Sequence, residues 1–155
     1  MNSRKDINAL EQAVMGKLLE GDDKVLSELR FQFAKATVKE REMTRVGFYL
    51  TFSLPENSSK LTDQIPNVKP NFCFGDVNAE IESLKNGASF LIWVTDGKLD
   101  MLEGYAYYGI WPEAVGEFQL NYFSEPRNVS RLRKQWLTSS PIGPSDTGDV
   151  QIEQN

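Results

Sequence analysis

One short hairpin signal limits the fold of this sequence more than any other feature. Asp96-Gly97 separates two mainly apolar runs, residues 90–94 and residues 99–102. Asp-Gly pairs favour the positive φ angles of a two-residue type I′ turn, which joins neighbouring antiparallel strands. Residues 90–94 are apolar on both faces, so this strand is expected in the middle of a sheet. Counting outward from the turn predicts three cross-strand pairs: Val94 with Leu99, Ile92 with Met101, and Leu91 with Leu102.

Other segments also carry strand signals. Residues 46–54 alternate between apolar and mainly small or polar side chains, which predicts a strand with one buried face. Residues 117–123 alternate in the same way near the end of the chain. A further β-rich stretch is expected over residues 72–84, and Asn86-Gly87 is expected to end it.

Helices are expected at both ends of the chain. In residues 1–36, apolar side chains recur every three or four positions, which predicts two helices separated near Gly21. Residues 127–137 predict a short basic helix. The expected fold class is therefore α+β, with N-terminal helices packed on a mainly antiparallel β-sheet and a short C-terminal helix. We expect one domain over residues 1–137 and a disordered tail over residues 138–155.

Residue types that the chain lacks exclude several kinds of chemistry. There is no histidine, so no Ser-His-Asp or Cys-His nucleophile pair and no histidine metal ligand can form. Cys73 is the only cysteine, so the chain can build neither an internal disulfide nor a structural zinc site. Glycine-rich phosphate loops and a calcium-binding loop are also missing. The sequence therefore predicts no metal and no cofactor. The favoured interpretation is a protein that is not an enzyme, and any catalysis would need carboxylates, amides, hydroxyls, Lys or Arg.

Composition also bears on location and on partners. The first residues do not resemble a signal peptide, and the longest apolar run, residues 90–94, is far shorter than a membrane helix. We therefore expect a cytoplasmic protein without membrane contact. The net charge is −5, which disfavours direct binding to a nucleic acid backbone.

The acidic residues are concentrated in the middle of the chain. Residues 54–126 contain eleven acids and four lysines, a net charge of −7, whereas residues 1–36 are neutral and residues 127–137 carry +4. Solvated loops and a solvated sheet face would explain such a segment. The alternative is a negative surface that docks a basic partner, since complementary charge steers association.

Residues 103–113 place three tyrosines and a tryptophan among glycines and acids. Such rings are enriched at protein interfaces, although they could equally seal the edge of the core. If the acidic segment and the aromatic rings together form a docking surface, they define ten candidate partner-binding residues. These are Asp76, Glu80, Glu82, Asp100, Glu103, Tyr105, Tyr107, Tyr108, Trp111 and Glu113.

Five short segments resemble a family of small bacterial proteins whose activity is uncharacterised. They are Val46-Gly47-Phe48, residues 74–81, residues 96–99, residues 102–105 and Trp111-Pro112-Glu113. In size, charge and lack of catalytic groups the chain also resembles, by type, the immunity proteins of contact-dependent growth inhibition and related polymorphic toxin systems. This second resemblance implies a partner, the C-terminal domain of a cognate toxin, often a basic nuclease.

These observations favour a toxin-neutralising immunity protein that blocks its partner by occlusion through an acidic, aromatic-containing surface. One alternative is a small-ligand binder or carboxylate-dependent enzyme that uses Glu80, Glu103 or Glu113 in a pocket behind the hairpin. Another alternative is a housekeeping interaction module or a self-assembling dimer. Acids that converge in a deep apolar cleft would favour an enzyme, and a convex acidic face would favour occlusion.

Overall fold

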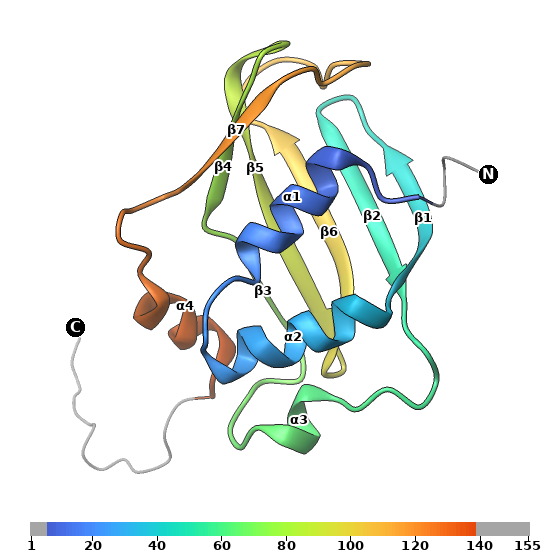
Figure 1. The fold of residues 1–155 in the computed structure, drawn as a ribbon, viewed down its shortest axis with the longest axis vertical. Helices are drawn as coiled ribbons and strands as arrows, with labels where there is room; N and C mark the ends of the chain where they lie inside the picture. The colour runs from blue at the N-terminus through green and yellow to red at the C-terminus, as the bar shows by residue number, and fades with distance from the viewer. Residues whose placement is uncertain (1–5, 139–155) are drawn as a thin grey trace.

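A computed structural model describes residues 6–138 and shows a seven-stranded sheet with helices on one face (Figure 1). The α+β fold expected from the sequence is confirmed. The predicted tail, apart from Thr138, lies outside the described residues. The helices are α1 (Ala9–Leu18), α2 (Lys24–Lys35), α3 (Leu61–Gln64) and α4 (Val129–Trp136). The strands are β1 (Thr37–Met43), β2 (Gly47–Ser53), β3 (Phe72–Phe74), β4 (Val77–Ile81), β5 (Leu84–Thr95), β6 (Lys98–Ala106) and β7 (Phe118–Tyr122).

The sheet is antiparallel in every recorded pair, with the strand order β1-β2-β6-β5-β4-β7. β5 is the longest strand, and β3 and β4 pair with its two halves on the same side. β5 therefore lies in the middle of the sheet, as its two apolar faces predict.

The β5–β6 turn has the predicted conformation. Asp96 and Gly97 both have positive φ angles, +52° and +75°. Val94 pairs with Leu99, as predicted. These angles match a type I′ turn, so the local hairpin prediction is confirmed.

Beyond the turn, a β-bulge changes the register. Asp100 is an extra residue in β6, so the strands shift by one position. The predicted partner of Ile92 is wrong, because Ile92 pairs with Leu102. The predicted partner of Leu91 is also wrong, because Leu91 pairs with Glu103. The shift places Leu102 toward the helices, where it is fully buried, and turns Glu103 to the other face.

Asn86-Gly87 does not end a strand, contrary to the prediction. β5 continues through both residues, and the turn that precedes it lies at Glu82-Ser83. Gly87 has a φ angle of +80°, and a Cβ there would lie 2.6 Å from the backbone oxygen of Ala79. The glycine therefore marks an irregularity in the β4–β5 pairing, not a chain reversal.

The hydrophobic core lies between the sheet and the helices. Trp136 of α4 packs edge-to-face on Phe74 of β3, with ring centroids 5.2 Å apart. Val14 of α1 and Leu29 of α2 are fully buried. Within the described residues, no helix combines the length and the hydropathy needed to cross a lipid bilayer.

A buried glutamine fastens α2 to the hairpin. The Gln32 amide donates from Nε2 to the backbone oxygens of Gly97, at 3.1 Å, and Ser59, at 3.0 Å. Its Oε1 accepts a hydrogen bond from the backbone N–H of Leu99 at 2.7 Å. Because Gln32 is only 5% exposed, water cannot easily replace these bonds.

We therefore expect Gln32→Ala to destabilise the protein by about 2–3 kcal/mol, since it leaves buried backbone groups without partners. Urea unfolding measures the change. Gln12→Ala, at an exposed glutamine of α1, is the matched control and should change the free energy of unfolding by less than about 0.5 kcal/mol. Equal effects of the two substitutions would contradict this role of Gln32.

Candidate functional site

Within residues 6–138, no helix covers the sheet face opposite α1 and α2, and we call this surface the helix-free face (Figure 1). Side chains of a strand alternate between the two faces, so every second residue of β2, β5 and β6 points to it. None of these central side chains is fully exposed, because neighbouring side chains partly cover them. The central residues are Tyr49, Thr51, Cys73, Leu91, Trp93, Met101, Glu103 and Tyr105.

The register of the sheet assembles the central residues into rows. Residues directly opposite each other in an antiparallel pair point to the same face. A face that stays in water usually carries mainly polar side chains, whereas these rows are mainly apolar. The first row consists of Tyr49, Glu103 and Leu91, and the second of Thr51, Met101, Trp93 and Cys73.

A hydrogen bond fixes the centre of the helix-free face. The indole Nε1 of Trp93 donates to Oε1 of Glu103 at 3.1 Å. Within residues 6–138, no lysine or arginine forms an ion pair with Glu103. The face therefore presents a half-buried carboxylate among apolar and aromatic side chains without an internal counter-ion.

Cys73 lies beside Trp93 on the same face. Burial raises the pKa of the Cys73 thiol, and the nearby negative charge of Glu103 raises it further. The thiolate is the reactive form of cysteine, so this environment makes Cys73 a poor nucleophile at neutral pH. Its thiol is nevertheless a useful reporter of the charge on Glu103.

Charged side chains surround these central residues. At the bulge, the Asp100 carboxylate accepts a hydrogen bond from the Thr95 hydroxyl at 2.8 Å. Acids outnumber bases around the face, even before Glu103 is counted. The surrounding acids are Glu40, Glu42, Glu80 and Asp100, and the lysines are Lys85, Lys98 and Lys39 at the bulge of β1.

Five of the ten predicted site residues lie on or beside the helix-free face. Tyr105 and Tyr107 contact each other edge-to-face, with ring centroids 6.2 Å apart, and Tyr107 is 50% exposed. The aromatic residues therefore continue from the sheet centre toward the turn between β4 and β5. The five residues are Glu80, Asp100, Glu103, Tyr105 and Tyr107.

Asp76 has a structural role instead. It is 9% exposed, and its carboxylate accepts hydrogen bonds from Arg127 Nε, at 2.7 Å, and Nη2, at 2.9 Å. Arg127 also donates to the backbone oxygens of Leu18 and Glu20, at the end of α1. The Asp76 carboxylate is therefore occupied inside the fold and is not presented to a partner.

The same cluster includes Tyr122 of β7. The guanidinium of Arg127 lies 4.6 Å from its ring centroid, and its hydroxyl donates to the backbone oxygen of Lys17 at 2.7 Å. Burial raises the pKa of Tyr122 to about 12. The phenol therefore stays protonated as a donor throughout the physiological range.

The remaining predicted residues lie away from the centre of the helix-free face. Trp111 is 9% exposed and packs edge-to-face on Phe48, with ring centroids 5.4 Å apart, so it seals the core. Tyr108 is 73% exposed, and Glu113 is exposed in the connection between β6 and β7. Glu82 lies in the β4–β5 turn, where Oε1 accepts a hydrogen bond from the backbone of residue 117.

Sequence reasoning missed several central residues of the helix-free face. Tyr49 is a large aromatic residue at a position of the 46–54 strand where the alternation predicts a small or polar side chain. In the sequence, Leu91 and Trp93 indicate only a central strand. Apolar or aromatic residues at all three positions, Tyr49, Leu91 and Trp93, are the sequence pattern that could have indicated an uncovered but largely apolar sheet face.

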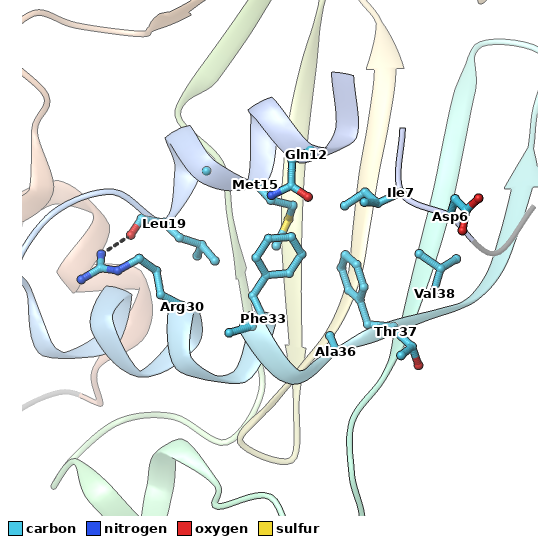
Figure 2. A pocket seen from close by; sticks show the side chains of 13 residues that line it. Asp6, Ile7, Gln12, Met15, Leu19, Arg30, Phe33, Ala36, Thr37 and Val38 are labelled. Carbon is cyan, nitrogen blue, oxygen red and sulfur yellow. Dashed lines mark hydrogen bonds between the residues drawn. The ribbon is translucent and has the colours of Figure 1, made fainter. Parts of the chain in front are cut away.

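A groove between α1, α2 and the start of β1 has a volume of about 780 Å³ (Figure 2). Its floor is apolar and includes Met15, Phe33 and Val38. Gln12 reaches over the groove, whereas Arg30 points away and donates to the backbone of Leu19 (Figure 2). Asp6 is the acid that lines this groove, and none of the ten predicted site residues does, so the groove does not bring the predicted carboxylates together.

A shallow hollow of about 790 Å³ lies at the β4–β5 turn. Glu80, Glu82 and Glu117 line it together with Tyr107, and all three carboxylates are solvent-exposed. In the part of the chain that the structure describes, no group of three or more His, Cys, Asp or Glu residues is placed to hold a metal ion. These acids therefore form a charged surface and not a buried catalytic pair.

Comparison with protein-family models, curated proteins and solved structures finds no match to this chain. The resemblances drawn from short segments and from protein type therefore remain predictions. The geometry of the helix-free face is the main structural guide to function.

The Cys73 thiol tests the electrostatics of this face. Glu103→Gln removes a negative charge but keeps a hydrogen-bond acceptor for Trp93, so the pKa of Cys73 should fall. We expect alkylation by iodoacetamide at pH 8 to become about two- to tenfold faster. Asp22→Asn, an exposed change at the start of α2, is the control and should leave the rate unchanged. An unchanged rate in Glu103→Gln would contradict the influence of Glu103 on the thiol.

Proposed function

We propose that this protein neutralises a basic toxin domain by binding it through the helix-free face and covering its active surface. The observation that carries the proposal is an aromatic and apolar sheet centre around Glu103, a carboxylate that accepts a hydrogen bond from Trp93 but forms no ion pair within residues 6–138. Protein interfaces share this arrangement, in which a largely apolar centre is surrounded by a polar margin. The proposal therefore assigns binding, and not catalysis, to the site.

The charge of the face favours a basic partner. Five acids, including Glu103, stand against three lysines on the strands that form it. Such a surface raises the rate of encounter with a positively charged protein, and salt weakens this effect. A partner arginine fits the centre well, because its guanidinium could pair with Glu103 and stack on Tyr49 or Trp93.

The face is also pre-organised for binding. Trp93 and Glu103 hold each other through a hydrogen bond, and the central side chains are already half-buried by their neighbours. Side chains fixed before association lose less conformational entropy on binding. Rigid strands, and not mobile loops, therefore carry the proposed anchors.

The alternative of a carboxylate-dependent enzyme has less support. Glu103 lies at the centre of the helix-free face, Glu80 lies on β4, and Glu113 lies in the β6–β7 connection. Neither the groove between α1 and α2 nor the hollow at the β4–β5 turn brings these three acids together. A two-carboxylate mechanism needs both groups on opposite sides of one bound substrate.

The test is binding to the toxin domain encoded beside this gene. We expect Glu103→Gln to lower the association rate about three- to tenfold and to flatten its dependence on salt between about 50 and 500 mM. Surface-based binding kinetics measure both effects. Asp22→Asn, on the helix side, should leave the kinetics unchanged.

A second measurement locates the contact. Binding of the toxin through this face should protect Cys73 from alkylation, because the thiol lies in its second row of side chains. Absence of binding would refute the toxin partner. Binding with full reactivity of Cys73 and no effect of Glu103→Gln would assign the contact to another surface.

A further inference from the structure

The edge strand β7 offers unpaired backbone groups to a partner. β7 is last in the strand order, and among the described residues 6–138 it pairs only with β4. The backbone N–H of Phe123 donates to the backbone oxygen of Asp76, and the backbone N–H of Glu82 donates to the backbone oxygen of Glu117. Hydrogen-bonded positions alternate along an antiparallel pair, so the odd-numbered residues of β7 bond to β4. The backbone groups of Phe118, Leu120 and Tyr122 therefore point outward.

The two edge strands of the sheet, β1 and β7, differ in the features that discourage pairing with another chain. β1, at the opposite edge, carries charged residues in succession, Lys39, Glu40, Arg41 and Glu42, together with a bulge. Charges and bulges of this kind discourage pairing with another chain. β7 contains no charged residue, no proline and no bulge in its pairing with β4. Its outward backbone groups are thus available for strand addition.

We propose that a second copy of this chain pairs with β7, antiparallel to it, about a two-fold axis at Leu120. In this register Leu120 pairs with its own copy, and Phe118 pairs with Tyr122 of the other copy. Each pair matches outward-pointing groups on both strands and permits two backbone hydrogen bonds. The strand is self-complementary because its outward positions are symmetric about Leu120.

The side chains suit the same register. Phe118 and Tyr122 form an aromatic cross-strand pair on the helix side, and the two Leu120 side chains meet between them. On the helix-free face Gln119 lies opposite Asn121, so two amides meet and no like charges do. An isologous interface requires this match of one surface with itself.

The contact between α1 and β7 is compatible with the pairing. α1 reaches β7 near Tyr122, whose hydroxyl donates to the backbone of Lys17. A two-fold axis at Leu120 places the two Tyr122 residues, and hence the two contacts with α1, at opposite ends of the paired strands. The product is one continuous antiparallel sheet with helices on one side and the two helix-free faces joined on the other.

The association state and its response to charge test this inference. We expect sedimentation to show a concentration-dependent dimer of twice the 17.6 kDa chain mass. The variant Gln119→Lys/Asn121→Lys opposes like charges across the interface and should weaken the dimer at least about tenfold. The variant Gln119→Lys/Asn121→Glu opposes unlike charges and should restore it.

A matched control separates this effect from a change in net charge. Gln64→Lys/Gln135→Lys adds the same two charges at exposed positions of α3 and α4 and should leave the dimer intact. Circular dichroism and thermal unfolding confirm that each variant is folded. A monomer at every concentration, or a dimer that Gln119→Lys/Asn121→Lys does not weaken, would overturn the inference.

Cross-linking reads the register directly. Residues 119 and 121 of opposite copies form a pair without backbone hydrogen bonds, in which Cβ atoms lie close enough for a disulfide. In a Cys73→Ser background, Gln119→Cys/Asn121→Cys should therefore form a covalent dimer in oxidised glutathione. Gln119→Cys alone should not, because its copy lies two positions away. Equal cross-linking of both variants would contradict the register.

Discussion

The extra residue in β6 at Asp100 is the constraint on which both faces of the sheet depend. A regular hairpin would pair Glu103 with Phe90, which is fully buried against the helices. A carboxylate at that position would lose its hydration without a counter-ion, at a cost of several kcal/mol. The bulge instead places Gly104 beside the ring of Phe48 and leaves Glu103 on the helix-free face. The one inserted residue thus has two effects: it keeps a carboxylate out of the core, and it places Glu103 at the candidate site.

Buried polar contacts attach the helices to one side of this sheet. Glu11 of α1 is 1% exposed and forms an ion pair with Arg41 of β1 at 2.7 Å. The Asp76–Arg127 pair joins the end of α1 to the segment before α4, and Gln32 joins α2 to the hairpin. Removing one partner of such a buried pair leaves an unsatisfied group, so each contact favours one arrangement of the helices.

Local patterns explain which parts of the fold were predictable. The period of the apolar residues predicts α1, α2 and β2, because one face of each is buried. The Asp96-Gly97 turn is a property of two adjacent residues and was predicted correctly. The bulge was not, because it depends on which side chains the two faces of the finished sheet accept. The prediction for Gly87 is wrong for another reason, because a glycine suits a bulge and a turn equally well.

The candidate site was predictable in part, for related reasons. Charge and aromatic content identified residues such as Glu103 and Tyr105 that the sheet brings together. Asp76 carries the same charge, but its partner Arg127 is distant in sequence, so no local pattern reveals their ion pair. The partial exposure of Trp93 could not be predicted, because a central strand that is apolar on both faces normally indicates a sheet that is covered on both faces.

Two surfaces of this protein are open to a partner: the helix-free face and the outer edge of β7. The long helices of the described residues 6–138 pack on one face, so the opposite face keeps Leu91, Trp93 and Met101 in contact with water. An uncovered apolar surface is stable in isolation only while its area stays small, and half-burial by neighbouring side chains limits the area here. Pairing through β7 would leave this centre uncovered, because it lies on β5 and β6, two or more strands from the edge. A partner on the face and a second copy at the edge can therefore bind at the same time, since each uses groups that the other leaves free.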